Sequence, residues 1–361
     1  MPQDTTPKTL RLIVGCYTKS LPHVEAKGEG ISFVDVDTRS GEFRQVSVHT
    51  GIGNPSYVSY DADRGLLYAV EELPEQDASL VVYRADPGMA SLEYLAKVPA
   101  HGDWPCHIGF DSPRNRVFLS NYESGSFVVW PLDNDGLPGG KATVIQRSGQ
   151  GANPERQEGP HVHFGVETPD GRHVLVCDAG TDEISAYPLT GESGIAMEAD
   201  NVLEAPPGSL PRHVDFSIDG KRFFVVSELG NLISTYAWSP ESIELLGHVS
   251  TLPEDNTRES ASAAVRVHPN GRFLYSSNRG HDSIAIFDIS NPERLPKLIG
   301  THPTSGNTPR EFAIDASGQF MVVANQDSHN LVLLGIDSVG GTLSTIGNGF
   351  STGSPVCVAL L

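Results

Sequence analysis

The sequence predicts an all-β fold, and three observations support this prediction. Glycine (37) and proline (26) are abundant among the 361 residues, above their usual combined share of about 12%. Helical periodicity of any length is absent, whereas short alternating runs of Val, Ile, Tyr and Phe recur between Asp, Asn and Gly turns, as in strands. One such unit also repeats along the chain. These features indicate many short strands that are joined by tight turns.

The repeated unit starts with a small residue or proline, followed by an apolar run, a polar turn and a second apolar run. Its copies read NPSYVSYDADRGLLYAVEE from Asn54, WPCHIGFDSPRNRVFLSNY from Trp104, GPHVHFGVETPDGRHVLVCDAG from Gly159, LPRHVDFSIDGKRFFVVSEL from Leu210, SASAAVRVHPNGRFLYSSNRG from Ser260 and TPREFAIDASGQFMVVANQ from Thr308. A third run, such as SFVVWPL or SIAIFDI, and a weaker fourth one follow each copy. The copies start about 46 to 55 residues apart, near the roughly 40–50 residues of a four-stranded propeller blade. We therefore predict a β-propeller of four-stranded antiparallel blades.

The two ends of the chain are predicted to complete one blade together. SPVCVALL at the end begins a seventh copy and stops, whereas LRLIVGCYT, GISFVDVD and GEFRQVSV near the start supply three strands without an opening one. Pairing these strands removes the exposed edges of an open sheet. We predict seven blades in one domain over residues 1–361, closed by the N- and C-terminal strands, with 1–9 as a flexible tail. The polar segment GKATVIQRSGQGANPERQEGP from Gly140 is expected to be an ordered loop over one face.

The composition excludes several classes of partner. With a net charge of −20, the chain repels phosphate backbones and anionic membrane surfaces, so neither nucleic acid nor a membrane is an expected partner. No apolar stretch approaches the roughly 18 residues of a membrane span, and the start of the chain does not resemble a signal peptide. The four cysteines form no CxxC pair, so we expect buried thiols and a cytoplasmic location.

In a propeller the first strand of each blade starts, and the second strand ends, at the same face, so residues at these positions surround one mouth of the central channel. The starting positions supply Tyr57, His107, His161, His163, Arg212, His213, Arg310 and Glu311. The ending positions supply Glu71, Glu72, Asn121, Tyr122, Asp178, Glu228, Asn278, Arg279, Asn325 and Gln326. In so acidic a chain, this gathering of His and Arg with carboxylates predicts a site for an anionic or oxygen-rich small molecule.

At these positions the sequence resembles the lactonase family of seven-bladed β-propellers, which includes propeller-type 6-phosphogluconolactonases and carboxy-cis,cis-muconate cyclases. The resemblance covers nearly the whole chain, through IVGCYT, GISFVDVDTRSGEF, NPSYVSYD, WPCHIGFD, NPERQEGPHVHF, LPRHVDF, SELGN, SNRGHDSIAIFDI, TPREFAID and SPVCV. It implies catalytic residues at His163 in PHVH, Arg212 in PRH, Glu228 in VVSEL and Arg279 in SNRG. Around them we expect substrate-binding residues at His107, His161, His213, Arg310 and Gln326.

These residue types suit the opening of a lactone. Water must attack the ester carbonyl, the oxyanion must be stabilised, and the leaving alkoxide must be protonated. We predict Glu228 or His163 as the base, because general acid–base help is worth roughly 10²–10⁴-fold. Arg212 is predicted to stabilise the oxyanion, for about 10²–10³-fold. Arg279 and Arg310 are predicted to hold the substrate anion, since guanidinium groups bind phosphate or carboxylate in bidentate fashion.

Structural interpretations of the same residues stay open at this point. His161 and His163 share one strand face at i, i+2, which suggests metal ligands, but no further spaced His or Cys completes a set. We therefore predict neither a metal nor another cofactor. Arg212 and Arg279 could instead form structural ion pairs with Asp178, with Glu228 or with another blade's acid.

The resulting function is a lactone hydrolase acting on a small anionic sugar-acid lactone, with 6-phosphogluconolactone as the best single candidate. One alternative is a lactonising enzyme of the carboxy-cis,cis-muconate cyclase type, because the reverse reaction at a similar carbonyl uses the same side chains. Another is a non-catalytic propeller that serves as a ligand- or protein-binding platform, since fold alone does not settle function. The oligomeric state is not readable from the sequence.

Overall fold

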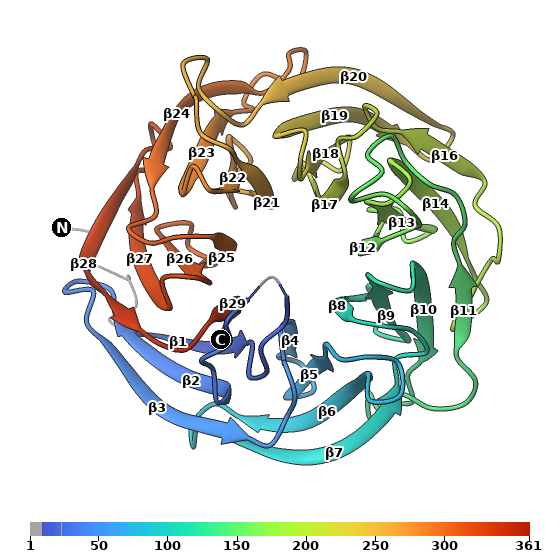
Figure 1. Ribbon diagram of the computed structural model, residues 1–361, viewed down its shortest axis with the longest axis horizontal. Helices are drawn as coiled ribbons and strands as arrows, with labels where there is room; N and C mark the ends of the chain where they lie inside the picture. The colour runs from blue at the N-terminus through green and yellow to red at the C-terminus, as the bar shows by residue number, and fades with distance from the viewer. Residues whose placement is uncertain (1–8, 23) are drawn as a thin grey trace.

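The computed structural model describes residues 9–22 and 24–361, which form seven blades in a ring around a central axis (Figure 1). Every named secondary-structure element in these residues is a β-strand. Each blade is an antiparallel sheet of four strands running from the axis to the rim, and the blade of β12 carries an additional two-residue strand, β15. The predicted all-β, seven-bladed propeller is confirmed.

The strands fall into four concentric sets. The innermost strands are β29 (Pro355–Leu360), β4 (Val58–Asp61), β8 (Pro105–Phe110), β12 (Val162–Glu167), β17 (Pro211–Phe216), β21 (Ala261–Val267) and β25 (Pro309–Ile314). The second strands are β1 (Thr9–Cys16), β5 (Leu66–Glu71), β9 (Arg116–Asn121), β13 (His173–Asp178), β18 (Arg222–Ser227), β22 (Phe273–Arg279) and β26 (Phe320–Asn325). The third strands are β2 (Gly30–Asp37), β6 (Ser79–Asp86), β10 (Ser126–Pro131), β14 (Glu183–Thr190), β19 (Leu232–Ser239), β23 (Ser283–Asp288) and β27 (Asn330–Ile336). The outer strands are β3 (Phe43–Thr50), β7 (Ser91–Pro99), β11 (Thr143–Gln146), β16 (Asn201–Glu204) with β15 (Gly194–Ile195), β20 (Ser242–Ser250), β24 (Lys297–Pro303) and β28 (Leu343–Ser351).

The ring closes through the two ends of the chain, as predicted. The C-terminal strand β29 pairs antiparallel with β1, with Leu12 opposite Leu360, and β2 and β3 complete that blade (Figure 1). Of the tail predicted at 1–9, residues 1–8 lie outside the described residues, and Thr9 already belongs to β1. The segment from Gly140 is only partly a loop, because its residues 143–146 form the outer strand β11.

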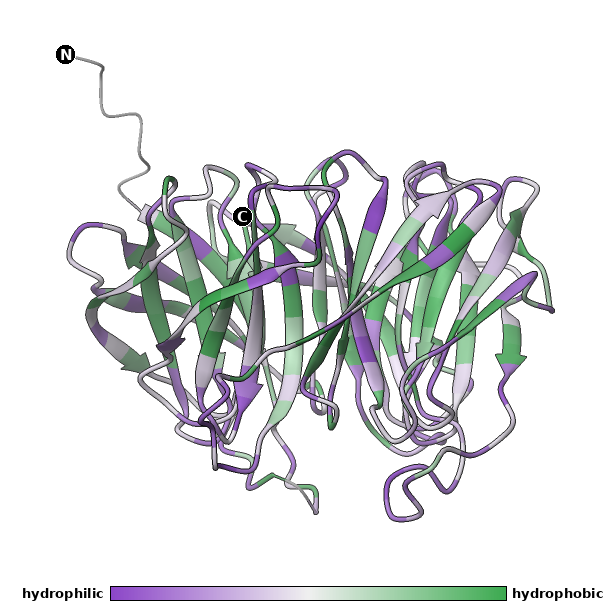
Figure 2. Cartoon of the chain, turned by 90° about the horizontal axis from the view of Figure 1, so that it is seen from above, coloured by the Kyte–Doolittle hydropathy of each residue, from purple (hydrophilic) through white to green (hydrophobic). Residues whose placement is uncertain are grey.

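The apolar core lies between the blades. Seven clusters of buried side chains each join two neighbouring sheets, such as Tyr68 with Leu119 and Phe224 with Leu274. Figure 2 shows the same arrangement, with hydrophobic residues along the strands and hydrophilic residues in the loops of both faces. Because burying one such side chain stabilises by about 1.5–3 kcal/mol, the blades hold one another in place and fix the channel between them.

A recurring backbone feature shapes one mouth of the channel. A residue with a positive φ stands before the opening proline in five blades: Asn54 (45°), Trp104 (56°), Leu210 (59°), Thr308 (59°) and Ser354 (41°). The proline has no amide hydrogen to donate, and in β8, β17, β25 and β29 it is the first residue of the strand. The left-handed conformation costs a non-glycine residue roughly 1–2 kcal/mol, which the surrounding packing must offset.

The structure also bears on membrane-spanning helices and on the state of the cysteines. Within them, no helix is long and apolar enough to cross a membrane. All four cysteines are free and buried, as the sequence predicted.

Candidate active site

A cavity of about 550 Å³ opens at the mouth where the innermost strands start and the second strands end. It is lined by Pro22, Glu72, Trp104, Cys106, Tyr122, Glu123, Arg156, His163, Glu228, Arg279 and Arg310. A narrow inner space adjoins it and shares four of these residues, and it adds Arg212 and His213 to the lining. Charged residues from distant parts of the sequence thus lie together around one cavity.

Bulges in the innermost strands direct several side chains towards the cavity and the inner space. The strand register shifts between Pro105 and His107 in β8, between Val162 and Phe164 in β12, between Pro211 and His213 in β17, and between Pro309 and Glu311 in β25. The residue skipped in each case is Cys106, His163, Arg212 or Arg310. A bulge releases one residue from ladder pairing and re-aims its side chain. All four of these residues line the cavity or the inner space.

Glu228 is the centre of an ionic cluster. Its carboxylate contacts Arg156 Nη2 at 2.8 Å, Arg279 Nη2 at 3.0 Å and Arg212 Nε at 3.3 Å. Burial alone raises the pKa of Glu228, but the charges of Arg279, Arg212 and Arg156 outweigh burial and hold that pKa well below its usual range. Glu228 is therefore ionised at neutral pH and has little tendency to take up a proton.

Arg212 lies deepest in this cluster and is 2% exposed. Its Nη1 donates to the carbonyl of Ala263 at 2.7 Å and lies 3.1 Å from His213 Nε2. Burial, together with the charges of Arg279 and Arg310, lowers the pKa of Arg212 to about 9. The guanidinium thus remains positive at neutral pH at the floor of the site.

Three histidines pack around Arg212 in the channel. The ring centroids of His163 and His213 lie 5.2 Å apart, and those of His107 and His213 lie 6.2 Å apart. Burial and the neighbouring Arg212 hold the pKa of His163 well below its usual range, and the pKa values of His107 and His213 are lowered too. His163 alone among them lines the cavity, and its Nδ1 has no hydrogen-bond partner among the described residues.

Arg310 differs from the other cavity arginines. Its guanidinium lies 5.7 Å from the centroid of the Tyr17 ring. No hydrogen bond or ion pair joins it to another side chain in the described part of the chain, whereas Arg156, Arg212 and Arg279 all contact Glu228. A half-buried cation without such a partner is suited to bind an anionic group.

The whole arrangement matches one known family. Residues 11–360 match the family described as "Lactonase, 7-bladed beta-propeller". The chain belongs to this lactonase family. It is 33% identical over 350 residues to a 6-phosphogluconolactonase of Bacillus subtilis, covering 96% of this chain and 97% of that one.

Solved structures agree with the sequence comparison. A putative 6-phosphogluconolactonase from Bacteroides fragilis superposes with a TM-score of 0.89 at 27% identity, covering 99% of both chains. A periplasmic gluconolactonase from Pseudomonas aeruginosa superposes with a TM-score of 0.88 at 27% identity, covering 98% of this chain and 99% of that one. The protein is a lactone-hydrolysing enzyme, and its membership of the family predicted from the motifs is confirmed.

The lactonase brings most of the predicted site residues together. His163, Glu228, Arg279 and Arg310 line the cavity, and Arg212 and His213 line the inner space. The catalytic and binding roles of these residues stay predictions.

Three predicted substrate-binding residues of the lactonase lie outside the cavity lining. His107 is buried between the rings of Phe164 and Tyr57. His161 stacks on Tyr122 at 4.5 Å between centroids, and its Nδ1 lies 3.0 Å from the Tyr122 carbonyl. Gln326 is buried, and its Nε2 donates to Asp327 Oδ1 at 2.9 Å. His161 therefore supports a cavity wall instead of sharing an open face with His163.

Sequence reasoning gave no catalytic or binding role to Arg156 or Glu72, which both line the lactonase cavity. Arg156 reaches Glu228 from the polar segment after β11, inside the NPERQEGP motif. Glu72 follows β5, and both of its carboxylate oxygens accept hydrogen bonds from the Tyr17 hydroxyl, at 3.0 and 3.1 Å. The adjacent pair Glu71 and Glu72 indicated a carboxylate near the channel, but the sequence does not say which of the two faces it.

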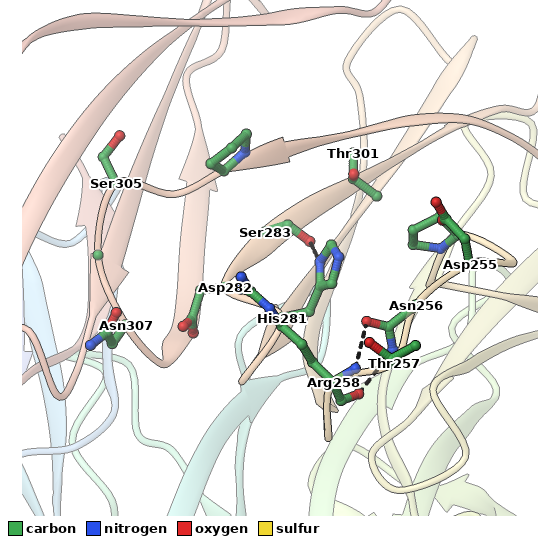
Figure 3. Close-up of a pocket in the computed structure, with 13 residues that line it drawn as sticks. Asp255, Asn256, Thr257, Arg258, His281, Asp282, Ser283, Thr301, Ser305 and Asn307 are labelled. Atoms are coloured by element: carbon green, nitrogen blue, oxygen red, sulfur yellow. Dashed lines mark hydrogen bonds between the residues drawn. The ribbon is translucent and has the colours of Figure 1, made fainter.

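A second, larger hollow lies away from this site. It measures about 610 Å³ and is lined by loops that include Arg258, His281 and Asp282 (Figure 3). Its lining residues are exposed or half-buried except for Ser283, and His281 Nδ1 lies 2.6 Å from Ser283 Oγ. None of the predicted site residues lines it. The channel mouth, with its cluster of buried charged groups, is therefore a better candidate for the active site than this larger hollow.

Proposed function

We propose that this lactonase hydrolyses a sugar-acid lactone that carries an anionic group, with 6-phosphogluconolactone as the preferred substrate. The observation that carries the proposal is Arg310, which pairs with no acid among the described residues, at a mouth that holds three further arginines. The relatives named 6-phosphogluconolactonase support the same choice.

In the proposed complex, Arg310 and Arg279 hold the anion. Arg279 donates from Nε to the Ala261 carbonyl and from Nη2 to the Ser262 carbonyl, both at 3.2 Å, which fixes its position at the end of β22. Its Nη1 makes no hydrogen bond within the described residues and is available to a ligand. A phosphate that bridges two guanidinium groups gains charge-assisted hydrogen bonds and places the lactone carbonyl deeper in the cavity.

Arg212 then stabilises the oxyanion that forms when water attacks the carbonyl. It stays charged, it is buried, and its carbonyl and carboxylate partners keep it in place before the reaction starts. A preorganised donor of this kind contributes about 10²–10³-fold in rate. Glu228 serves this step as the counter-ion that orients the arginines.

The two bases predicted from the sequence differ in their surroundings. Glu228 is a weak base, because its arginine neighbours lower its pKa well below the usual range. His163 is neutral and its Nδ1 has no hydrogen-bond partner among the described residues, but burial and Arg212 lower the pKa of its imidazole. His163 is therefore proposed to orient the attacking water.

The test is a lactone panel with the purified enzyme, in which acid release is followed above the spontaneous rate in buffer. We expect kcat/KM for 6-phosphogluconolactone to exceed that for gluconolactone by at least about tenfold, since one charge-assisted hydrogen bond is worth roughly 1.5–3 kcal/mol. Equal values for the two lactones would contradict the phosphate preference. Failure to open any lactone faster than buffer would contradict the proposed function itself.

For the location we propose the cytoplasm. The four free thiols suit a reducing compartment, in which disulfides are rare. Fractionation of the producing cell, followed by immunodetection of the enzyme in the soluble cytoplasmic and extracytoplasmic fractions, tests this proposal.

A further inference from the structure

We propose that Glu72 is the group that takes the proton from water and returns it to the leaving alkoxide during lactone opening. The proposal rests on the proposed function. Glu72 lines both the cavity and the inner space, and it is 3% exposed. Its backbone is held at the end of β5, where its amide donates to the Asn54 carbonyl at 3.1 Å. The carboxylate therefore has a fixed position beside the space that substrate and water would fill.

Glu72 is distinguished from its neighbour in the chain. Glu71 accepts hydrogen bonds from the Ser79 hydroxyl at 2.6 Å and the Gly53 amide at 3.0 Å, and it forms an ion pair with Lys97. Glu71 lines neither space. Of two successive carboxylates, one is thus occupied by structural partners and the other faces the cavity.

Glu72 also differs from the other carboxylates of the cavity lining. Glu228 contacts three guanidinium groups, and Glu123 is exposed. Glu72 forms no ion pair with any described residue, and its hydrogen bonds come from the neutral hydroxyl of Tyr17. Burial raises its pKa above the usual value, against the opposing charge of Arg310. A carboxylate in such a setting binds a proton more readily than Glu228 does, which suits a general base.

The step balances without any further reagent. As the water oxygen bonds to the lactone carbonyl carbon, one water proton moves to a Glu72 oxygen, and the carbonyl electron pair moves to the oxygen near Arg212. When the tetrahedral intermediate collapses, the ring C–O bond breaks. The leaving alkoxide takes the proton back from Glu72, and the product is a hydroxy acid. Glu72 ends as it began, as a carboxylate.

Tyr17 acts as a positioning residue for this carboxylate. Its hydroxyl contacts both oxygens of Glu72, and its buried ring faces Arg310. The hydrogen bond from Tyr17 lowers the pKa of Glu72, so its removal should raise that pKa. The acidic limb of the kcat profile should therefore move to higher pH in Tyr17→Phe, while the rate at the alkaline plateau changes much less.

The experiment compares Glu72→Gln with Glu71→Gln in steady-state kinetics and thermal unfolding. Glu72→Gln keeps the shape of the side chain, and we expect kcat to fall by at least about 100-fold with little change in KM or Tm. Glu71→Gln loses the ion pair with Lys97, and we expect it to lower Tm while kcat and the pH profile stay as in the wild type.

The outcomes separate this inference from the proposed function. A wild-type enzyme that opens no lactone contradicts the proposed function. A wild-type enzyme that is active, with Glu72→Gln within about threefold of its kcat, overturns the role of Glu72 alone. If Glu72→Gln does not fold, the pH profile of Tyr17→Phe decides: an upward shift of the acidic limb supports the proposal, and an unmoved limb refutes it.

Discussion

Replacing Glu228 by glutamine removes the carboxylate that three guanidinium groups contact within 2.8 to 3.3 Å. The amide has nearly the same volume, so packing is preserved and the charge is the main change. The side chains of Arg212 and Arg279 are 2% and 17% exposed, so they keep their positive charges in a poorly solvated place. We therefore expect Glu228→Gln to destabilise the enzyme.

The magnitude follows from the burial of the partners. Removing one member of a buried ion pair costs about 3–5 kcal/mol, because the remaining charge is left without compensation. Arg156, with a side chain 40% exposed, adds only about 0–1 kcal/mol. With an unfolding entropy of about 2.1 cal/mol/K per residue, the 361 residues convert the combined loss of about 3–6 kcal/mol to a decrease in Tm of about 4–8 °C.

The pH dependence has a definite sign. Because the pKa of Glu228 is lowered in the folded enzyme, its contribution is fully present above its ordinary value and is lost as pH falls through the folded value. The difference in Tm between wild type and Glu228→Gln should therefore be largest near pH 7 and should shrink below about pH 4.5. Scanning calorimetry at several pH values measures it, with the exposed Glu244→Gln of β20 as the matched control.

Inorganic phosphate provides a second readout of the same cluster. An anion bound in the cavity beside Arg156 and Arg279 replaces the charge that the variant lacks, so phosphate should raise the Tm of Glu228→Gln more than that of the wild type. An unchanged Tm in phosphate-free buffer, or equal responses of both proteins to phosphate, would refute the reasoning.

Three further predictions concern the same mouth. Arg156→Ala should lower the free energy of unfolding by less than about 1 kcal/mol while raising KM, since its ion pair is partly exposed but it lines the cavity; urea titration and steady-state kinetics measure the two effects, and a large loss of stability would contradict the prediction. Arg310→Met should lower kcat/KM for 6-phosphogluconolactone by about 10- to 100-fold but affect gluconolactone far less, which the lactone panel measures; equal losses would remove Arg310 from anion binding. Because burial lowers the pKa values of His107, His163 and His213, the unfolded chain takes up protons that the native one does not, and stability should fall as pH decreases from 7 to 5, by up to about 1.4 kcal/mol per pH unit and histidine. Urea titrations at these pH values should show a shallower decline in His213→Gln, and an unchanged slope would contradict the prediction.

The fold was predictable because its signals are local and repeated. Each blade carries its own opening residue, alternating strands and polar turn, so the number of blades follows from counting the copies. The half-copy at Pro355 predicted the closure, since a lone strand at one end requires partners from the other, and β29 pairs with β1.

The site was predictable only as a neighbourhood. The propeller topology places starting and ending positions at one mouth, which brought His163, Glu228 and Arg279 together. Which side chain points into the cavity depends on a bulge in β12 between Val162 and Phe164 that no residue pattern announces. A regular strand would have placed His161 and His163 on one face.

Contacts between residues far apart in the sequence could not be predicted from local sequence patterns. Arg156 sits in a polar segment and reaches across to another blade, 72 positions further along the chain, where its partner Glu228 follows β18. The separate surroundings of Glu71 and Glu72 likewise come from Lys97 and Tyr17, which neither residue's own strand contains.

We expect the lactone to bind in the arginine-lined mouth and not in the hollow near Arg258. A crystal structure with the non-hydrolysable lactam analogue of 6-phosphogluconolactone shows which of the two places is occupied. The phosphate is expected between Arg310 and Arg279, with the lactam carbonyl directed at Arg212. An analogue bound in the hollow near Arg258 (Figure 3), with the channel mouth left empty, would contradict the claim.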